Sequence, residues 1–230
     1  MGRKSSKILK LPSRPIFGFA VEGDCEYDYL KIVLNVTNPH KVKNVQGGSE
    51  VVCVREALAL LGNTEDKQIQ KYGTHAYQYV FVVFDTDIMT QEKINEIKAL
   101  LVLAKNKKHS QKLKFIISNQ CFEYVLGLHF SPMKHPTTIN SNKHMKQYDY
   151  EDHKIDPTRT QLMIDLKNDP NTYLMMYNRL KKRDEQLGLD TNTSWMERVK
   201  PENNPNSNFY TILEHLASIQ PLPCLLQSLE

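Results

Sequence analysis

The chain has 230 residues and a formal net charge of +4, so one domain with additions is expected, although two domains are not excluded. This charge permits nucleic acid as a substrate but is too small for a protein that coats DNA. No apolar run approaches the length of a membrane span, which argues against a membrane protein.

The N-terminal segment and the cysteines predict a cytoplasmic protein. Residues 1–14 are basic and lack an apolar signal core, so we expect a flexible leader rather than an export signal. The four cysteines are Cys25, Cys53, Cys121 and Cys224, and no two of them form a CxxC pair. Reduced thiols are therefore expected, and a zinc site built on the cysteines is disfavoured.

Strands and helices alternate over residues 15–130. In chain order we expect a strand at 16–21, a helix from Glu26, a short strand within 41–48, a helix over 49–62, a strand at 79–84, a helix over 90–105, a strand at 113–118 and a helix over 121–130. Asp24 and Thr90 are predicted N-caps, and Gly62 is a predicted helix stop. The alternation predicts an α/β fold with a mostly parallel sheet flanked by helices.

The composition changes after Pro132. Residues 131–156 are rich in His, Lys, Asn and Tyr, which predicts a long polar loop or insertion. Residues 157–230 are predicted to form a helical extension packed on the α/β domain. Its helices are expected to open at Thr158, at Asp169–Pro170 and near residue 208.

Acidic residues follow two of the predicted strands. Glu22 ends the first strand, and Glu26 lies one turn into the next helix. Asp85 and Asp87 end the second strand, where residues i and i+2 point to the same side. Since parallel strand ends share one edge of the sheet, Glu22 is predicted to meet this pair in a Mg²⁺ or Mn²⁺ site. The alternative is that Asp24 and Asp87 only cap helices.

Four segments resemble, in order, motifs of the RloB-like family, which has a toprim-type α/β fold. EGDCEYDYL is similar to its EGxxTExxYF, VVFDTD to its VFDRD, ISNQCFEYVLGLHF to its SNPCFExWLLLHF, and NPNSNFYTILEHL to its closing NPST-type helix start. The third motif is the most specific. Cys25 replaces the usual threonine, and Thr86 replaces an arginine, which removes a phosphate contact but leaves the metal ligands intact.

The resemblance implies roles for five acidic residues. Glu22 matches a catalytic base or metal ligand, and Asp85 and Asp87 match the metal-binding pair. Glu26 matches the second family glutamate, and Glu123 matches the acid of the third motif. These two glutamates would complete or orient the site.

Other lysine, cysteine and histidine residues can be interpreted either as functional or as structural. Lysines that would contact a nucleic-acid backbone are Lys107, Lys108, Lys112, Lys143 and Lys146, although such stretches more often form solvated helix ends or loops. Cys121 beside His129 could be a nucleophile, but a small buried residue at a helix start is the preferred interpretation. The histidines at 129, 135, 144 and 153 are assigned structural or surface roles, with His129 the best exception.

Our first hypothesis is a Mg²⁺-dependent toprim nuclease that cleaves RNA or DNA. The resemblance implies a role in anti-phage defence with a separate ATPase of the ABC or AAA type, since this sequence has no GxxxxGK[ST] loop. The alternatives are a non-catalytic adaptor that binds an ATPase or nucleic acid, and phosphoryl chemistry on a small molecule. Whether the chain forms a homo-oligomer is left open.

Overall fold

A five-stranded sheet forms the centre of the molecule. The computed structural model describes residues 16–37, 40–46, 48–62, 77–86, 89–104, 110–119, 121–130, 145–150, 152–169, 171–203 and 205–219. The strands are β1 (Ile16–Val21), β2 (Lys41–Asn44), β3 (Tyr77–Asp85), β4 (Leu113–Asn119) and β5 (Asn206–Ser207). Their order is β2-β1-β3-β4-β5, with the first four parallel and β5 antiparallel to β4. The predicted α/β class with a mostly parallel sheet is confirmed.

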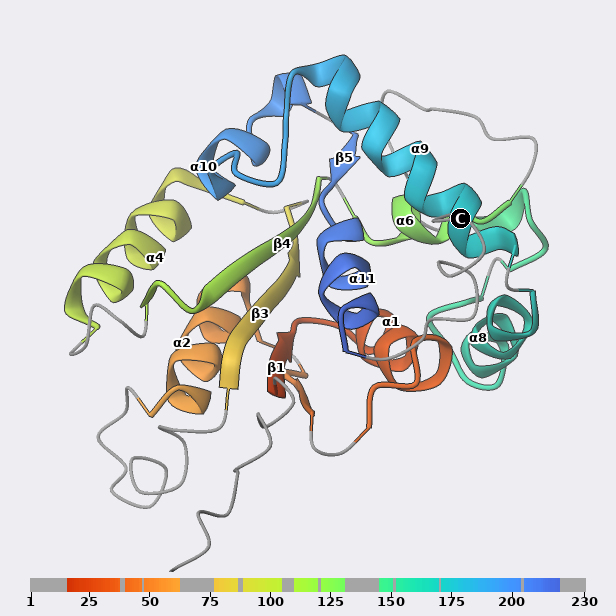
Figure 1. Ribbon diagram of the computed structural model, residues 1–230, viewed down its shortest axis with the longest axis horizontal. Helices are drawn as coiled ribbons and strands as arrows, with labels where there is room; N and C mark the ends of the chain where they lie inside the picture. The colour runs from red at the N-terminus through yellow and green to blue at the C-terminus, as the bar shows by residue number, and fades with distance from the viewer. Residues whose placement is uncertain are drawn as a thin grey trace, which may run out of the picture.

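Helices cover both faces of the sheet. They are α1 (Asp24–Asp28), the π-helix η1 (Tyr29–Val33), α2 (Glu50–Leu60), α4 (Gln91–Leu103), α6 (Glu123–Gly127), α8 (Thr158–Asn168), α9 (Asn171–Leu187), α10 (Trp195–Arg198), the 3₁₀ helix η2 (Pro201–Asn203) and α11 (Tyr210–Ala217). In Figure 1, α2 and α4 lie on one side of β3 and β4, and α1, α8, α9 and α11 lie on the other.

The strands divide the interior into two apolar cores, because successive side chains of a strand face opposite sides. Phe19 and Phe81 stack on the side of α9 and α11, with ring centroids 5.1 Å apart. Ala20 and Val82 face the core that includes α2 and α4. This double burial explains why β1 and β3 are almost continuously apolar in sequence.

Local sequence signals predicted the start of α4 and the end of α2 correctly, but they predicted the start of α1 incorrectly. Thr90 caps α4 by accepting a hydrogen bond from the Lys93 N–H, and Gly62 ends α2 with a φ of 80°. Asp24 is not an N-cap, because α1 begins at Asp24 itself and Gly23 holds the cap position. The Asp24 carboxylate instead accepts hydrogen bonds from the side chains of Asn44 and Gln46.

The described residues of 157–219 are largely helical, as expected, although they also contribute β5 to the sheet. Residues 220–230 lie outside the described residues, and the polar segment before the extension is partly buried. Residues 1–14 and 131–144 lie outside the described residues. Within the rest of the predicted loop, Met145 and His153 are 0% exposed, so this segment packs onto the domain. The short elements β5 and α10 were not predicted. None of the helices in the described ranges is long and apolar enough to cross a membrane.

Candidate metal centre

The carboxyl ends of β1 and β3 bring two of the predicted acids together. The two strands are parallel neighbours, and the Glu22 N–H donates to the Val83 carbonyl at 3.1 Å. The Asp85 N–H donates to Glu22 Oε2 at 3.3 Å. The expected meeting of Glu22 and Asp85 is therefore present, whereas Asp87 lies outside the described residues.

Glu26 enters the same place from the first turn of α1. Its side chain is buried, with 4% of its surface exposed. A Cβ atom at Gly23 would lie 2.5 Å from Glu26 Oε2, so this carboxylate occupies space that any other residue at position 23 would fill. The backbone at Gly23 is extended, so the glycine is required here for close approach rather than for an unusual conformation.

Glu123 completes the group from the far side. It opens α6, shortly after the carboxyl end of β4, and it is 3% exposed. We predicted an amphipathic helix over 121–130, but α6 is a five-residue helix that is buried on every side. Glu123 Oε1 accepts a hydrogen bond from His153 Nε2 at 2.9 Å and pairs with Lys154 Nζ at 3.2 Å.

These side chains line one open pocket of about 320 Å³. Its lining residues are Glu22, Gly23, Asp24, Cys25, Glu26, Asp85, Phe122, Glu123, Lys154 and Arg159. Four of the five acids that the sequence singled out are therefore side by side. Two cations join them, neither of which the sequence analysis identified.

Burial and mutual repulsion control ionisation in the pocket. Burial, together with the charges of Glu26 and Glu123, raises the pKa of Asp85 well above its ordinary value. Burial also raises the pKa of Glu26 to about 8. Burial opposes ionisation of Glu123 too, but the hydrogen bond from His153 and the charge of Lys154 outweigh it and hold its pKa at about 2.

A divalent cation fits this donor set. Asp85 Oδ1 is buried and has no hydrogen-bond partner among the described residues. Glu22 and Glu26 supply further carboxylate oxygens, the hard ligands that Mg²⁺ and Mn²⁺ prefer. A cation would neutralise carboxylates that otherwise raise one another's pKa values.

Thr86, at the arginine position of the family motif, has a structural role. Its Oγ1 donates to Asn119 Oδ1 at 2.9 Å, and both residues are buried. Asn119 Nδ2 in turn donates to the backbone carbonyls of Arg198 and Lys200, at 3.0 Å each. Thr86 therefore ties the end of β3 to β4 and α10, and its side chain does not line the pocket.

Lys154 and Arg159 supply the positive charge of the pocket. Arg159 Nε donates to Asp28 Oδ2 at 2.6 Å, and its Nη1 lies 3.4 Å from Asp24 Oδ2. The Lys154 side chain is 56% exposed and can reorient toward a ligand. Lys154 lies in the irregular segment before α8, and Arg159 lies in the first turn of α8. Neither residue belongs to a motif, so the sequence analysis did not identify them.

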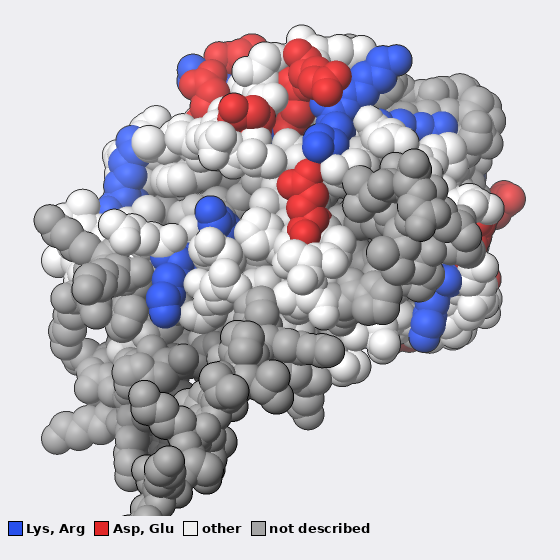
Figure 2. All heavy atoms as spheres, in the orientation of Figure 1, with Lys and Arg blue, Asp and Glu red and all other residues white. Residues whose placement is uncertain are grey.

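The predicted basic contacts do not converge on the pocket. Lys112 precedes β4, at the opposite edge of the parallel sheet from the carboxylates, and donates to the Tyr77 carbonyl at 3.2 Å. Lys146 is exposed in the segment 145–150, and Lys107, Lys108 and Lys143 lie outside the described residues. Figure 2 shows lysines and arginines dispersed over one face, with acidic side chains gathered near α9 and α10.

His129 and Cys121 are core residues. Thr172 Oγ1 donates to the Asp169 carbonyl, so it accepts the proton of His129 Nδ1 at 3.0 Å. His129 Nε2 then accepts from the Tyr29 hydroxyl at 2.8 Å, and burial lowers the pKa of His129 to about 3. Burial and the nearby Glu123 raise the pKa of the Cys121 thiol, which leaves it a poor nucleophile.

Comparison with known proteins agrees with the motif analysis. No curated protein and no solved structure matches the chain. The family model described as RloB-like protein matches residues 19–216, a span that contains every residue of the pocket. The chain therefore belongs to the RloB-like protein family.

Proposed function

We propose that the pocket is the active site of a metal-dependent nuclease that hydrolyses phosphodiester bonds in RNA or DNA. The observation that carries this proposal is the buried Asp85 Oδ1, which has no hydrogen-bond partner in the described part of the chain and lies in an open pocket lined by five carboxylates. Burial of carboxyl groups that raise one another's pKa values is unfavourable for folding, and it is typical of sites where a cation or a reacting ligand offsets that cost.

Glu22 and Asp85 would hold a Mg²⁺ or Mn²⁺ ion, with Asp87 as a third ligand. When bound, such an ion polarises a phosphoryl oxygen and lowers the pKa of an attacking water. Glu26, with a pKa near 8, is suited to carry a proton to or from a reacting oxygen near neutral pH. Lys154 and Arg159 would orient the phosphate from the opposite side of the pocket.

Family membership supports the wider setting. We propose that the chain acts in anti-phage defence and that an ATPase of the ABC or AAA type controls it, since the sequence has no phosphate-binding GxxxxGK[ST] loop of its own. The non-catalytic adaptor remains the second candidate. The adaptor is supported by the replacement of the motif's arginine with Thr86. The Thr86 hydroxyl is hydrogen-bonded to Asn119, so the pocket lacks that arginine.

The experiment compares Asp85→Asn with Glu96→Gln, a matched control on α4 whose carboxylate forms an exposed pair with Arg55. Labelled RNA and DNA are incubated with each protein and Mg²⁺, with and without a candidate ABC- or AAA-type ATPase from the same genome. We expect Asp85→Asn to lose cleavage by at least about a hundredfold while its circular dichroism spectrum is unchanged, because a metal ligand is lost. Full cleavage by Asp85→Asn contradicts the proposal, and metal-independent binding without cleavage by the wild type supports the adaptor.

A further inference from the structure

A second group of metal-ligating side chains adjoins the carboxylate pocket. Cys25 from α1, Glu123 from α6 and His153 from the segment before α8 are all buried, and one donor atom of each lies within 4.8 Å of the other two. We call these three residues the Cys-Glu-His cluster. They offer a sulfur, an oxygen and a nitrogen, unlike the all-oxygen set of Glu22, Glu26 and Asp85.

The orientation of His153 is the observation that points to a bound cation. Nδ1 lies 3.1 Å from the Tyr150 carbonyl, which can only accept, so Nδ1 carries a proton. Nε2 faces Glu123 Oε1 at 2.9 Å inside the protein. Without an ion, a proton on Nε2 bridges this contact. A metal ion that displaced that proton would be bound by the Nε2 lone pair together with the Glu123 carboxylate.

The geometry resembles that of a metal-binding histidine. Imidazole ligands usually donate their other ring N–H to a backbone carbonyl or a carboxylate, and this bond selects the tautomer and the ring orientation. His153 has that arrangement through Tyr150. Tetrahedral coordination separates neighbouring donors by about 3.5 Å, which the cluster can reach with small side-chain shifts.

The donor types select the class of ion. Thiolate and imidazole ligands favour borderline ions such as Zn²⁺ over Mg²⁺. Cys25 and Glu123 also line the open pocket, which supplies both an entry path and a fourth coordination position. Lys154 Nζ pairs with the same Glu123 oxygen that contacts His153. Its side chain is largely exposed, so it can move away when an ion binds and turn toward the pocket.

We propose that Cys25, Glu123 and His153 form a Zn²⁺-type site, separate from the Mg²⁺ site of Glu22 and Asp85. The site belongs to this chain rather than to the family motif, which has threonine at the position of Cys25. It uses one cysteine together with a distant histidine and a glutamate, so the absence of CxxC spacing does not argue against it. It also does not depend on the nuclease activity.

Cobalt titration of the reduced full-length chain tests the site. Co²⁺ stands in for Zn²⁺ and gives a near-ultraviolet charge-transfer absorption when a thiolate is a ligand. We expect this absorption to saturate at one ion per chain in the wild type. Cys25→Ser should abolish it, and His153→Gln should weaken Co²⁺ and Zn²⁺ binding by at least about tenfold. Zn²⁺ should raise the melting temperature of the wild type but not that of Cys25→Ser.

Three controls identify the ligands. Cys53→Ser, which changes another buried cysteine, should keep the absorption. Asp85→Asn should also keep it while losing Mg²⁺-dependent cleavage, which separates this site from the proposed nuclease site. A wild type without the absorption at saturating Co²⁺ overturns the proposal. So does an absorption that survives Cys25→Ser or that disappears instead in Cys121→Ser.

Discussion

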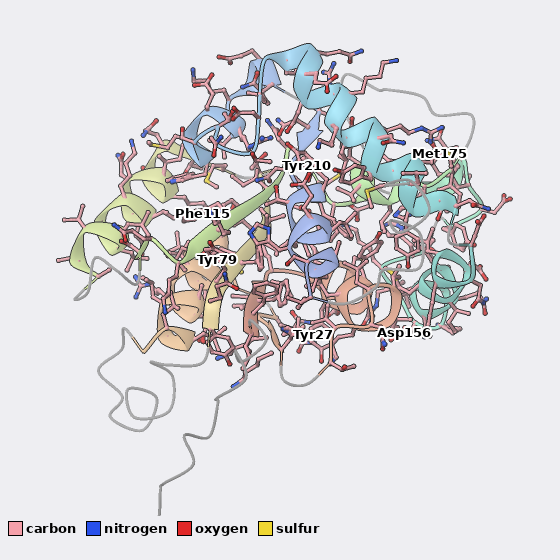
Figure 3. All side chains as sticks on the ribbon, in the orientation of Figure 1. Tyr27, Tyr79, Phe115, Asp156, Met175 and Tyr210 are labelled. Atoms are coloured by element: carbon pink, nitrogen blue, oxygen red, sulfur yellow. The ribbon has the colours of Figure 1, made fainter. Side chains whose placement is uncertain are left out.

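Two buried carboxylates in this protein, those of Asp184 and Asp85, differ in whether both of their oxygens are paired. Asp184 on α9 is 2% exposed and accepts from Arg198 Nη1 at 3.1 Å, from Nη2 at 2.8 Å and from the Tyr210 hydroxyl at 2.8 Å. Figure 3 shows Tyr210 where α11 approaches α9. In the carboxylate pocket, by contrast, Asp85 Oδ1 has no partner among the described residues. Both oxygens of Asp184 are paired, which indicates a structural role, whereas the unpaired oxygen of Asp85 belongs to a residue that lines an open pocket, which indicates a ligand.

The largest effect on stability is expected where the buried pair of Asp184 and Arg198 is broken. Arg198→Ala should lower the free energy of unfolding by about 3–5 kcal/mol, because it leaves the Asp184 carboxylate buried without its cation. Urea denaturation measures this change. Arg55→Ala, which breaks an exposed pair with Glu96, should cost less than about 1 kcal/mol. Equal costs for the two variants would remove the contrast between buried and exposed pairs.

The pocket should show the opposite pH dependence from an ordinary ion pair. The pKa of Glu26 in the folded protein, about 8, exceeds its ordinary 4.5, so the folded state holds a proton that the unfolded state releases. In chelator, stability should fall by several kcal/mol as the pH rises from about 4.5 to 8. Glu26→Gln should flatten this curve, and Mg²⁺ should restore stability at high pH. A flat wild-type curve contradicts the raised pKa.

Neutralising a pocket carboxylate should stabilise the metal-free protein. Asp85→Asn replaces a carboxyl group whose ionisation is opposed by burial and by the charges of Glu26 and Glu123, so we expect a gain of about 1–2 kcal/mol near neutral pH in chelator. Asp184→Asn should lower stability instead, because Arg198 loses its partner. Thermal unfolding of both variants checks the signs. If both variants lost stability, the carboxylates of Asp85 and Asp184 would both be stabilising, which would contradict the contrast between them.

The smallest stability effect should come from Gly23→Ala. The new Cβ would lie 2.5 Å from Glu26 Oε2, at the end of a side chain that can swing away, and the extended backbone accepts alanine. We expect a change below about 1 kcal/mol in stability together with a loss of about tenfold in cleavage, since the carboxylate is displaced. An unchanged cleavage rate would mean that the position of Glu26 is not critical.

Much of the α/β domain could be predicted from local pattern. The apolar runs of β1 and β3, the Thr90 cap and the Gly62 stop depend on residues close together in the sequence, where periodicity and capping act. The α1 start was misplaced because Asp24 has better partners in Asn44 and Gln46, from outside its own helix. Long-range contacts overrode the capping preference there.

The pocket also combines residues placed by local sequence pattern with residues placed by long-range contacts. Glu22 and Asp85 were predictable as neighbours, because parallel strands bring successive carboxyl ends to one edge. Lys154 reaches the pocket from the irregular segment before α8, and Arg159 reaches it from the first turn of α8. Their places, and that of His153 beside Glu123, depend on how these residues pack against α1 and α6. Strand order follows from local periodicity and connection rules, whereas burial of an irregular segment depends on distant partners that no local pattern encodes.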